Sequence, residues 1–228
     1  MRILLIGMPD VSFSDDLRHA AAELWSAQHD HPFVGGIADG TLDPRRFGFY
    51  VRQDYVFLIE YGRLLALACA RAPRLDWMEQ FADLARSTLH DEMELHRTYA
   101  EGWGISRGEL EREPADPTVR AYTDFLLRTA TLGEFGELVA ALLPCMWGYS
   151  ELGQGLAARG RPDDERYAQW IAAYASEEFA KLARWCRRVC DALGDDASPR
   201  LKRRMEVAFV TSSAHELAFW DAAWQSVP

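Results

Sequence analysis

Cys145 lies one residue after a proline and four residues before Tyr149, within the strongly apolar residues 142–153. Residues four positions apart share one face of a helix, so the thiol and the phenol would point to the same side. Pro144 has no main-chain N–H and therefore interrupts the helix beside the thiol. A thiol at such a break could act as a nucleophile, although a free cysteine in an apolar segment is more often a small core residue.

Two carboxylates also occur inside apolar helical patterns. Asp54 lies in the middle of residues 49–58, where a buried carboxylate would need hydrogen-bond partners. Glu216 precedes Phe219 and Trp220 by three and four positions. Burial among these rings would raise the pKa of Glu216 toward values that suit proton transfer.

Each polar candidate also has a purely structural interpretation. Asp54 could be solvated or could pair with Arg52, because isolated charges are seldom buried. Tyr122 and Tyr174 could bind a ligand through their hydroxyls, or they could be amphipathic core residues with the hydroxyl at a polar edge. Residue type and spacing alone do not separate these alternatives.

A metal site is a further possibility. Two histidines and two glutamates in residues 90–96 have helical i, i+4 spacing, His90 with Glu94 and Glu92 with His96. Helical bundles can hold carboxylate-bridged iron pairs, but the other inward carboxylates and a second Glu-x-x-His motif are not evident. We therefore favour a solvated charged face and expect no metal. Cys186 and Cys190 could supply two ligands to zinc, but a zinc site needs two more. We therefore interpret this pair as structural.

Composition narrows the class of protein. The chain has 228 residues, 49% of them apolar, which is ample for one hydrophobic core. A net charge of −10 disfavours nucleic acid and anionic membranes as partners. Four dispersed cysteines suit reduced thiols in a cytoplasmic protein, and no apolar stretch is long enough to span a bilayer. We interpret residues 1–12 as a loosely ordered extension before a single domain of residues 13–228.

Apolar residues recur at three- and four-residue spacing along most of the chain, which predicts an all-α protein. The first helix should cover residues 14–29, and a short helical turn could precede Gly40. Asp43 and Pro44 form a start signal for a long helix that ends near Arg71. The other expected helices cover residues 76–102, 118–132, 134–159, 165–193 (as one or two helices) and 198–224. Short connections between long helices indicate one compact bundle.

Taken in order, these segments resemble the TenA family, the thiaminase II or aminopyrimidine aminohydrolase proteins of thiamin salvage. The resemblance spans about residues 13–224. It rests on the ordered motifs Leu24-Trp25 to His31-Pro32-Phe33, Gly40-Thr41-Leu42, Gln53-Asp54-Tyr55, Glu92-Met93-Glu94-Leu95-His96, Ala121-Tyr122-Thr123, Pro144-Cys145 to Gly153, Tyr174 to Phe179, and Glu216 to Trp220. The fold that it implies is a haem-oxygenase-like helical bundle, commonly a homotetramer, that needs neither haem nor metal.

The resemblance also implies roles for single residues. Cys145 corresponds to the nucleophile, Asp54 to the aspartate that binds the aminopyrimidine, and Glu216 to the glutamate that moves protons. Three tyrosines would line the pocket and orient the thiol, namely Tyr122, Tyr149 and Tyr174. Phe57 takes the position of a frequent tyrosine that stacks on the substrate ring, so stacking should survive while a hydroxyl is lost.

The implied reaction is hydrolysis of 4-amino-5-aminomethyl-2-methylpyrimidine to its hydroxymethyl counterpart, with slower hydrolysis of thiamin. Addition of a thiolate to the pyrimidine ring would break its aromaticity and divide a difficult substitution into easier steps. One alternative is a metal-dependent oxidase on the same bundle that uses residues 90–96. Another is a non-enzymatic thiamin-binding or regulatory protein, although the charge of −10 argues against direct DNA binding.

Overall fold

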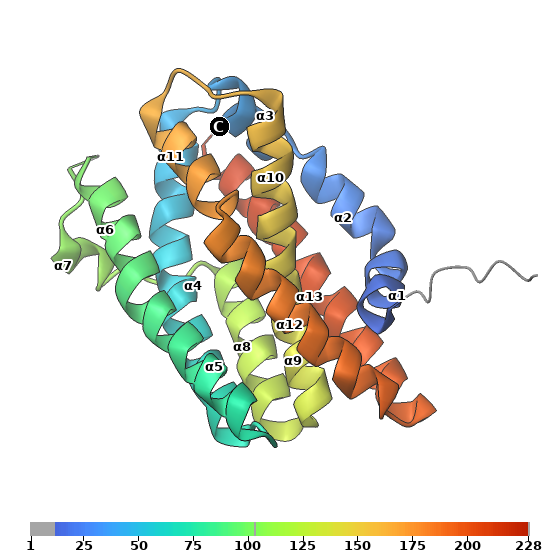
Figure 1. Ribbon diagram of the computed structural model, residues 1–228. Helices are drawn as coiled ribbons and strands as arrows, with labels where there is room; N and C mark the ends of the chain where they lie inside the picture. The colour runs from blue at the N-terminus through green and yellow to red at the C-terminus, as the bar shows by residue number, and fades with distance from the viewer. Residues whose placement is uncertain (1–11, 103, 228) are drawn as a thin grey trace, which may run out of the picture.

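The computed structural model describes residues 12–102 and 104–227, which form helices joined by short loops and, over these residues, no strands (Figure 1). The expected N-terminal extension falls almost wholly outside the described residues. Only Ser12 is described, and its hydroxyl caps the first helix by accepting a hydrogen bond from the main-chain N–H of Asp15 at 3.3 Å. No helix among the described residues is long and apolar enough to cross a membrane.

The elements in chain order are α1 (Phe13–Ala20), α2 (Ala22–His29), α3 (Pro32–Asp39), α4 (Pro44–Arg71), α5 (Leu75–Ser87), η1 (Thr88–Glu92), α6 (Met93–Glu101), α7 (Arg107–Leu110), α8 (Pro117–Leu132), α9 (Phe135–Leu143), η2 (Pro144–Gly148), α10 (Tyr149–Arg159), α11 (Glu165–Tyr174), α12 (Glu177–Asp195) and α13 (Pro199–Gln225). The two η elements are single π-helical turns. Each joins two α-helices without a loop, so α5 to α6 and α9 to α10 are continuous rods.

Local sequence signals explain where the principal helices begin. Four helices start with a capping side chain followed by proline at the first helical position: α3 after His31, α4 after Asp43, α8 after Asp116 and α13 after Ser198. The capping atom accepts a main-chain N–H that the helix cannot bond, and proline has no N–H to leave unpaired. The long helices that carry the site are therefore fixed in register at their N-termini.

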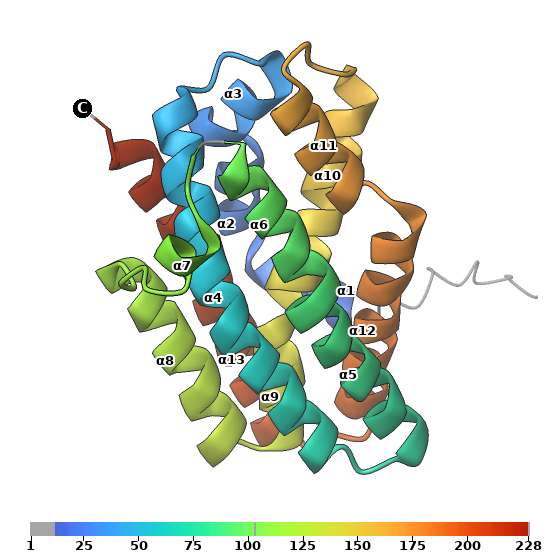
Figure 2. The same ribbon diagram turned by 90° about the vertical axis from the view of Figure 1, so that its left-hand side faces the viewer.

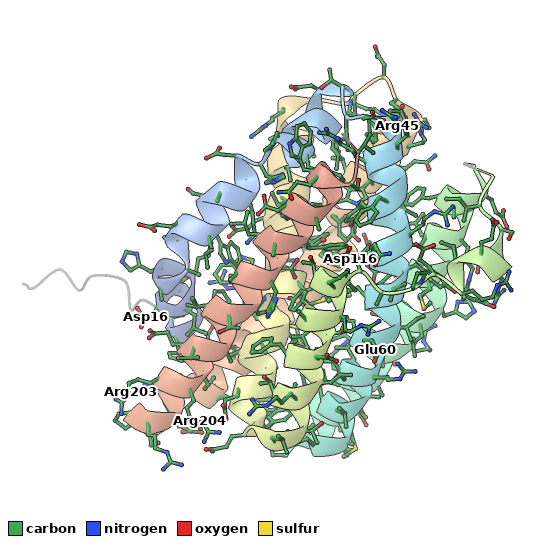
Figure 3. The ribbon with its side chains drawn as sticks, turned by 180° about the vertical axis from the view of Figure 1, so that it is seen from behind. Asp16, Arg45, Glu60, Asp116, Arg203 and Arg204 are labelled. Carbon is green, nitrogen blue, oxygen red and sulfur yellow. The ribbon has the colours of Figure 1, made fainter. Side chains whose placement is uncertain are left out.

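The helices pack as a bundle whose long members run along one another (Figures 1 and 2). Helix α13 lies against α9 and α8, and α4 lies against α5 and α8. Helix α12 packs on α9, while α1 and α2 contact α12 and α13 respectively. The outer face drawn in Figure 3 carries charges of both signs, among them Asp16, Glu60, Asp116, Arg45, Arg203 and Arg204. One hydrophobic core extends through the bundle, so the prediction of a single all-α domain is confirmed.

The structure departs from the expected helices at two places and decides between two alternatives at a third. The first helix is divided at Ala21, although the sequence has no proline or glycine there. Of the one or two helices expected for residues 165–193, the structure has two, because Ser176 accepts the N–H of Phe179 at 3.2 Å and starts α12 anew. The short helix α7 was not expected, although Ser106 and Glu109 form a capping box there.

Candidate active site

A small cavity of about 20 Å³ lies inside the bundle, between α4, the two π-helical turns, α10, α11 and α12. Such a volume holds about one water molecule, so a larger ligand would bind only if the side chains of the wall moved apart. The residues that line it are Asp54, Phe57, Leu58, Tyr61, Glu92, Cys145, Met146, Tyr149, Tyr174 and Phe179. The cavity therefore combines aromatic walls with two carboxyl groups and one thiol.

Cys145 reaches the cavity from η2, the π-helical turn that begins at Pro144. Proline cannot donate the hydrogen bond that would continue an α-helix, and single π-helical turns are frequent at functional sites. Burial raises the pKa of the Cys145 thiol well above its usual value, and the negative charges of Glu216, Glu92 and Asp54 add to this effect. The resting group is thus a neutral thiol that faces several potential proton acceptors.

Main-chain carbonyls beside this proline are bound by side-chain hydroxyls from other helices. Ser212 on α13 donates to the carbonyl oxygen of Ala141 at 2.7 Å, and Tyr61 on α4 donates to that of Leu142 at 3.2 Å. A buried carbonyl without a partner would cost free energy, so these hydroxyls stabilise the interrupted helix. They also attach the Cys145 segment to the two longest helices of the bundle.

Glu216 lies deeper in the core, behind the cavity wall formed by Phe57. Its Oε1 accepts a hydrogen bond from Tyr122 at 2.7 Å, and the Tyr122 hydroxyl also contacts Ser212 Oγ at 2.8 Å. The ring of Tyr122 packs on that of Phe57 with centroids 5.1 Å apart. Burial raises the pKa of Glu216 to about 8, against the opposing effect of the Tyr122 hydrogen bond. A carboxyl group with this pKa can both donate and accept a proton near neutral pH.

Asp54 forms a buried pair with a histidine. Its Oδ2 is 2.6 Å from His96 Nε2 and accepts a further hydrogen bond from the Tyr50 hydroxyl at 3.1 Å. The other ring nitrogen of His96 is 2.9 Å from the main-chain oxygen of Glu92. Burial would lower the pKa of His96, but the Asp54 and Glu92 carboxylates outweigh it, and the pKa is raised. Both of these hydrogen bonds to Asp54 use Oδ2, so Oδ1 can bind a ligand in the cavity.

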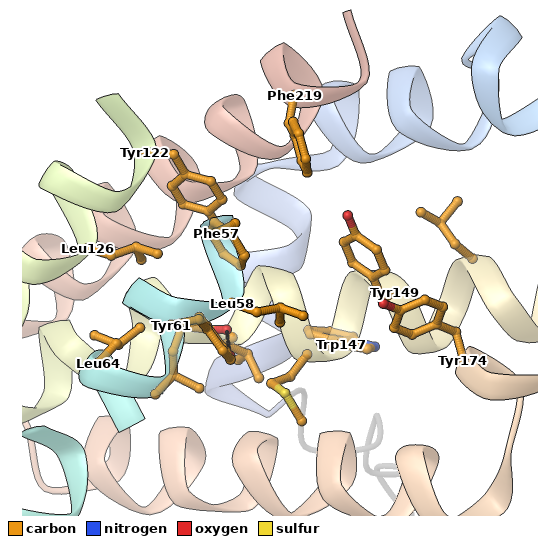
Figure 4. Close-up of a cluster of buried hydrophobic side chains, with 14 of the residues drawn as sticks. Phe57, Leu58, Tyr61, Leu64, Tyr122, Leu126, Trp147, Tyr149, Tyr174 and Phe219 are labelled. Atoms are coloured by element: carbon orange, nitrogen blue, oxygen red, sulfur yellow. Dashed lines mark hydrogen bonds between the residues drawn. The ribbon is translucent and has the colours of Figure 1, made fainter. Parts of the chain in front are cut away.

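Glu92 and two tyrosines complete the wall nearest to solvent. Burial raises the pKa of Glu92 to about 7, and its Oε1 accepts a hydrogen bond from Tyr174 at 3.3 Å. The rings of Tyr149 and Tyr174 lie side by side with centroids 4.9 Å apart (Figure 4). Tyr149 and Cys145 do line the same cavity, as their i, i+4 spacing predicts.

Gly153 allows helix α10 to approach the end of α11 closely enough for this tyrosine pair. A Cβ atom at position 153 would lie 2.5 Å from the main-chain carbon of Tyr174 and 2.7 Å from the nitrogen of Ala175. Main-chain atoms cannot turn aside as a flexible side chain would. Any residue larger than glycine must therefore push the two helices apart.

We expect Gly153→Ala to lower the free energy of unfolding by about 1–3 kcal/mol, the usual cost of overpacking. Gly155→Ala on the same helix is a matched control because a Cβ there meets no atom within 4 Å. It should be neutral, or stabilising by up to about 1 kcal/mol, since alanine is the better helix former. Urea denaturation of the three proteins measures both values, and equal stabilities would contradict the close approach.

A second, larger hollow of about 290 Å³ adjoins the first and shares four of its residues: Glu92, Met146, Tyr174 and Phe179. It lies between α5, η1, α6 and α12, and its walls include Leu84, Leu95 and Leu182. Three acidic residues line it, Asp91, Glu92 and Glu178, whereas no lysine, arginine or histidine does among the described residues. The enclosed cavity is therefore next to a more open and acidic one.

The structure brings together the residues that the sequence singled out. Five of them line the small cavity: Cys145, Asp54, Phe57, Tyr149 and Tyr174. The other two, Glu216 and Tyr122, lie behind it and not in its wall, although the charge of Glu216 acts on the thiol.

The interpretation of residues 90–96 as a solvated face is wrong for two of its members. His96 is buried against Asp54, and Glu92 lines the cavity, whereas His90 is exposed and pairs with Asp91. The spacing in the sequence could have indicated this difference. Glu92 and His96 are four residues apart and share the helix face that lies toward α4, whereas His90 lies on another face. Within the described residues, no three His, Cys, Asp or Glu side chains gather as they would around a metal ion.

The cavity inside this helical bundle is lined by a thiol, carboxyl groups and aromatic rings. These features are typical of a protein with a buried small-molecule site. The sequence profile described as the TENA/THI-4/PQQC family matches residues 18–226. The chain belongs to this family, so the resemblance seen in the sequence is confirmed.

Individual relatives agree with this assignment. The chain is 43% identical to a protein named aminopyrimidine aminohydrolase from Halalkalibacterium halodurans, over 94% of this chain and 96% of the relative. It is 36% identical to a protein of the same name from Bacillus subtilis, over 94% and 91% of the two chains. Among solved structures, a TenA homologue from P. horikoshii has a TM-score of 0.88 at 30% identity, covering 95% of this chain and all of that one. A domain with a heme oxygenase-like fold from Shewanella denitrificans has a TM-score of 0.64 at 11% identity, over 95% and 94% of the two chains, which confirms the predicted fold class.

Proposed function

We propose that this protein is a hydrolase of thiamin salvage that converts 4-amino-5-aminomethyl-2-methylpyrimidine to 4-amino-5-hydroxymethyl-2-methylpyrimidine and ammonia, and that hydrolyses thiamin more slowly. The observation that carries the proposal is one enclosed cavity that holds both Cys145 and Asp54, with the Glu216 charge acting on the thiol. Relatives of nearly the same length that are named for this activity support it.

The chemistry assigns a distinct task to each of three groups. Cys145, as the thiolate, adds to the pyrimidine ring and breaks its aromaticity, and ammonia then leaves as the ring rearranges to an exocyclic alkene. Glu216 protonates the ring during addition and later assists the transfer of the proton of water. Water adds to the alkene, the carbon–sulfur bond breaks, and the thiolate is released with the hydroxymethyl product.

Asp54 holds the amino-bearing edge of the ring through its free Oδ1, while His96 and Tyr50 fix the carboxylate by bonding Oδ2. Fixing both partners of a hydrogen bond in advance reduces the entropy that binding would otherwise cost. The face of the ring packs against Phe57, Tyr149 and Tyr174, the aromatic walls of the cavity. The group that leaves points toward the outer acidic hollow, where a positively charged amine or thiazolium is favoured by charge.

Replacement of Asp54 by asparagine should weaken pyrimidine binding without removing the thiol. We expect KM for the aminomethyl pyrimidine to rise at least about thirtyfold, because a hydrogen bond to a charged group is lost and His96 is left beside a neutral partner. Steady-state kinetics and calorimetric titration with the hydroxymethyl product measure the change. Glu60→Gln on the outer face of the same helix is the control and should bind normally (Figure 3). An unchanged KM in Asp54→Asn would remove Asp54 from the binding site.

The most direct test of the activity incubates the purified protein with each substrate and identifies the product by mass spectrometry. We expect the hydroxymethyl pyrimidine from both, with faster release from the aminomethyl compound. Absence of this product from both compounds would overturn the proposed function.

We also propose a cytoplasmic homotetramer. Four free cysteines support a reducing compartment, and five large apolar side chains are exposed among the described residues: Leu75, Met78, Leu89, Leu132 and Val207. Light scattering coupled to size-exclusion chromatography should give a mass close to four times the 25.9 kDa of one chain. A monomeric mass would contradict the tetramer and leave the proposed activity untouched.

A further inference from the structure

Tyr61 contacts the Cys145 segment in a way that the sequence did not suggest. Its ring is buried on α4 and stacks on Phe57 with centroids 5.4 Å apart, one helical turn further along (Figure 4). Its hydroxyl extends across the cavity and donates to the carbonyl oxygen of Leu142, three residues before the thiol. Tyr61 and Cys145 line the same cavity, and the Tyr61 hydroxyl is within hydrogen-bonding reach of the Cys145 thiol as well as of the carbonyl.

We propose that the Tyr61 hydroxyl is the group that stabilises the Cys145 thiolate during catalysis, by turning its O–H from the Leu142 carbonyl toward the sulfur. This inference rests on the proposed role of Cys145 as a nucleophile. A tyrosine hydroxyl has one proton and can rotate it between two acceptors that lie close together. No covalent bond changes, because the proton stays on Tyr61 throughout.

The surroundings make such a donor necessary. The other titratable groups that act on the thiol are Glu216, Glu92 and Asp54, and each of them opposes its ionisation. The hydrogen bond from Tyr61, in contrast, lowers the pKa of Cys145. Burial, with the Cys145 charge as a second cause, raises the pKa of Tyr61 well above its usual value, so the hydroxyl keeps its proton and remains a donor.

Phe57 explains why this role falls to Tyr61. Phe57 has no hydroxyl, although it lines the cavity one turn before Tyr61. The hydroxyls of two other nearby tyrosines donate elsewhere: that of Tyr122 to Glu216, and that of Tyr174 to Glu92. Of the two stacked rings on α4, only that of Tyr61 carries a hydroxyl.

The test measures the thiol directly and needs no turnover. Native protein and Tyr61→Phe are treated with iodoacetamide at several pH values, and alkylation of the Cys145 peptide is followed by mass spectrometry. We expect Tyr61→Phe to slow this alkylation about tenfold below pH 9, because a hydrogen bond to the charged form is lost. The kcat for the aminomethyl pyrimidine should fall by a similar factor while its KM stays within about twofold.

Tyr167→Phe is the matched control. Tyr167 is equally buried and donates to the main-chain oxygen of Leu42 at 2.8 Å, but it does not line the cavity. Both variants lose one bond to a carbonyl, so similar melting temperatures and a rate change in Tyr61→Phe alone support the proposal. Unchanged alkylation in Tyr61→Phe, or equal slowing in both variants, would overturn it.

A double variant distinguishes the loss of the hydroxyl from a general loss of folding in Tyr61→Phe. Phe57→Tyr combined with Tyr61→Phe keeps both rings and returns one hydroxyl to the stack, so alkylation should recover to within about threefold of the native rate. A double variant as slow as Tyr61→Phe would contradict a role for the hydroxyl. If the native protein alkylates as expected but hydrolyses neither substrate, the proposed function fails while the effect of Tyr61 on the thiol stands.

Discussion

Cys145→Ala should lose at least about a thousandfold in turnover of both substrates while the protein remains folded, because Cys145 is the only thiol among the residues that line the cavity. The side chain is only partly buried and has a cavity on one side, so its removal leaves the packed core intact. Product formation followed by mass spectrometry and a thermal melt of the same sample separate the two effects.

Cys69→Ala is the appropriate comparison. Cys69 is also a partly buried free cysteine, near the end of α4, and it does not line the cavity. We expect native turnover from this variant. Activity of Cys145→Ala close to that of Cys69→Ala would exclude the thiol mechanism, and the cavity would then bind its ligand without covalent chemistry.

Much of the fold could be predicted because its signals are local. Asp43 followed by Pro44 marks the start of α4, and Ser198 followed by Pro199 marks that of α13, in each case through hydrogen bonds within one turn. The π-helical turn at Thr88–Glu92 has no such signal, since it contains neither proline nor glycine. Its cause is tertiary: it turns Glu92 and His96 toward Asp54 and Tyr174.

The same distinction applies to the site. Cys145 and Tyr149 share a helix face, and their common orientation followed from spacing alone. The contact between His96 and Asp54 joins residues 42 positions apart, which no local pattern predicts. Tyr61 was missed for a related reason: its ring looks like any amphipathic core residue until the carbonyl of Leu142 is placed opposite its hydroxyl.

Burying polar side chains lowers the free energy of unfolding. Their presence around the cavity therefore indicates a chemical role for it. Asp54, His96 and Glu216 are each at most 4% exposed, in a core that apolar residues could have filled. Each is held by hydrogen bonds from another helix, so the free energy lost on burial is partly regained. A binding site that needed only shape would not require two carboxyl groups and a thiol within one small volume.

Glu216→Gln should reduce kcat at least about a hundredfold, because glutamine preserves the acceptor for Tyr122 but cannot move a proton. The native pH profile follows from the pKa of Glu216, which burial raises to about 8, and from that of Cys145, which is raised further. Catalysis needs one proton shared by the two groups. Activity should therefore rise about tenfold per pH unit up to about pH 8 and decline only where the thiol ionises as well.

Although Glu216→Gln should lower kcat, it should make the folded protein more stable than the native one at high pH. Folded Glu216 keeps its proton up to about pH 8, whereas in the unfolded chain it loses the proton near pH 4.5. Between these values the folded state binds more protons, so stability falls as the pH rises from 4.5 through 8. Glu216→Gln lacks this loss and should melt at a higher temperature than the native protein at pH 9, with a smaller difference at pH 5. An inactive variant that gains no relative stability at pH 9 would show that Glu216 titrates normally, and its proposed part in proton transfer would have to be given up.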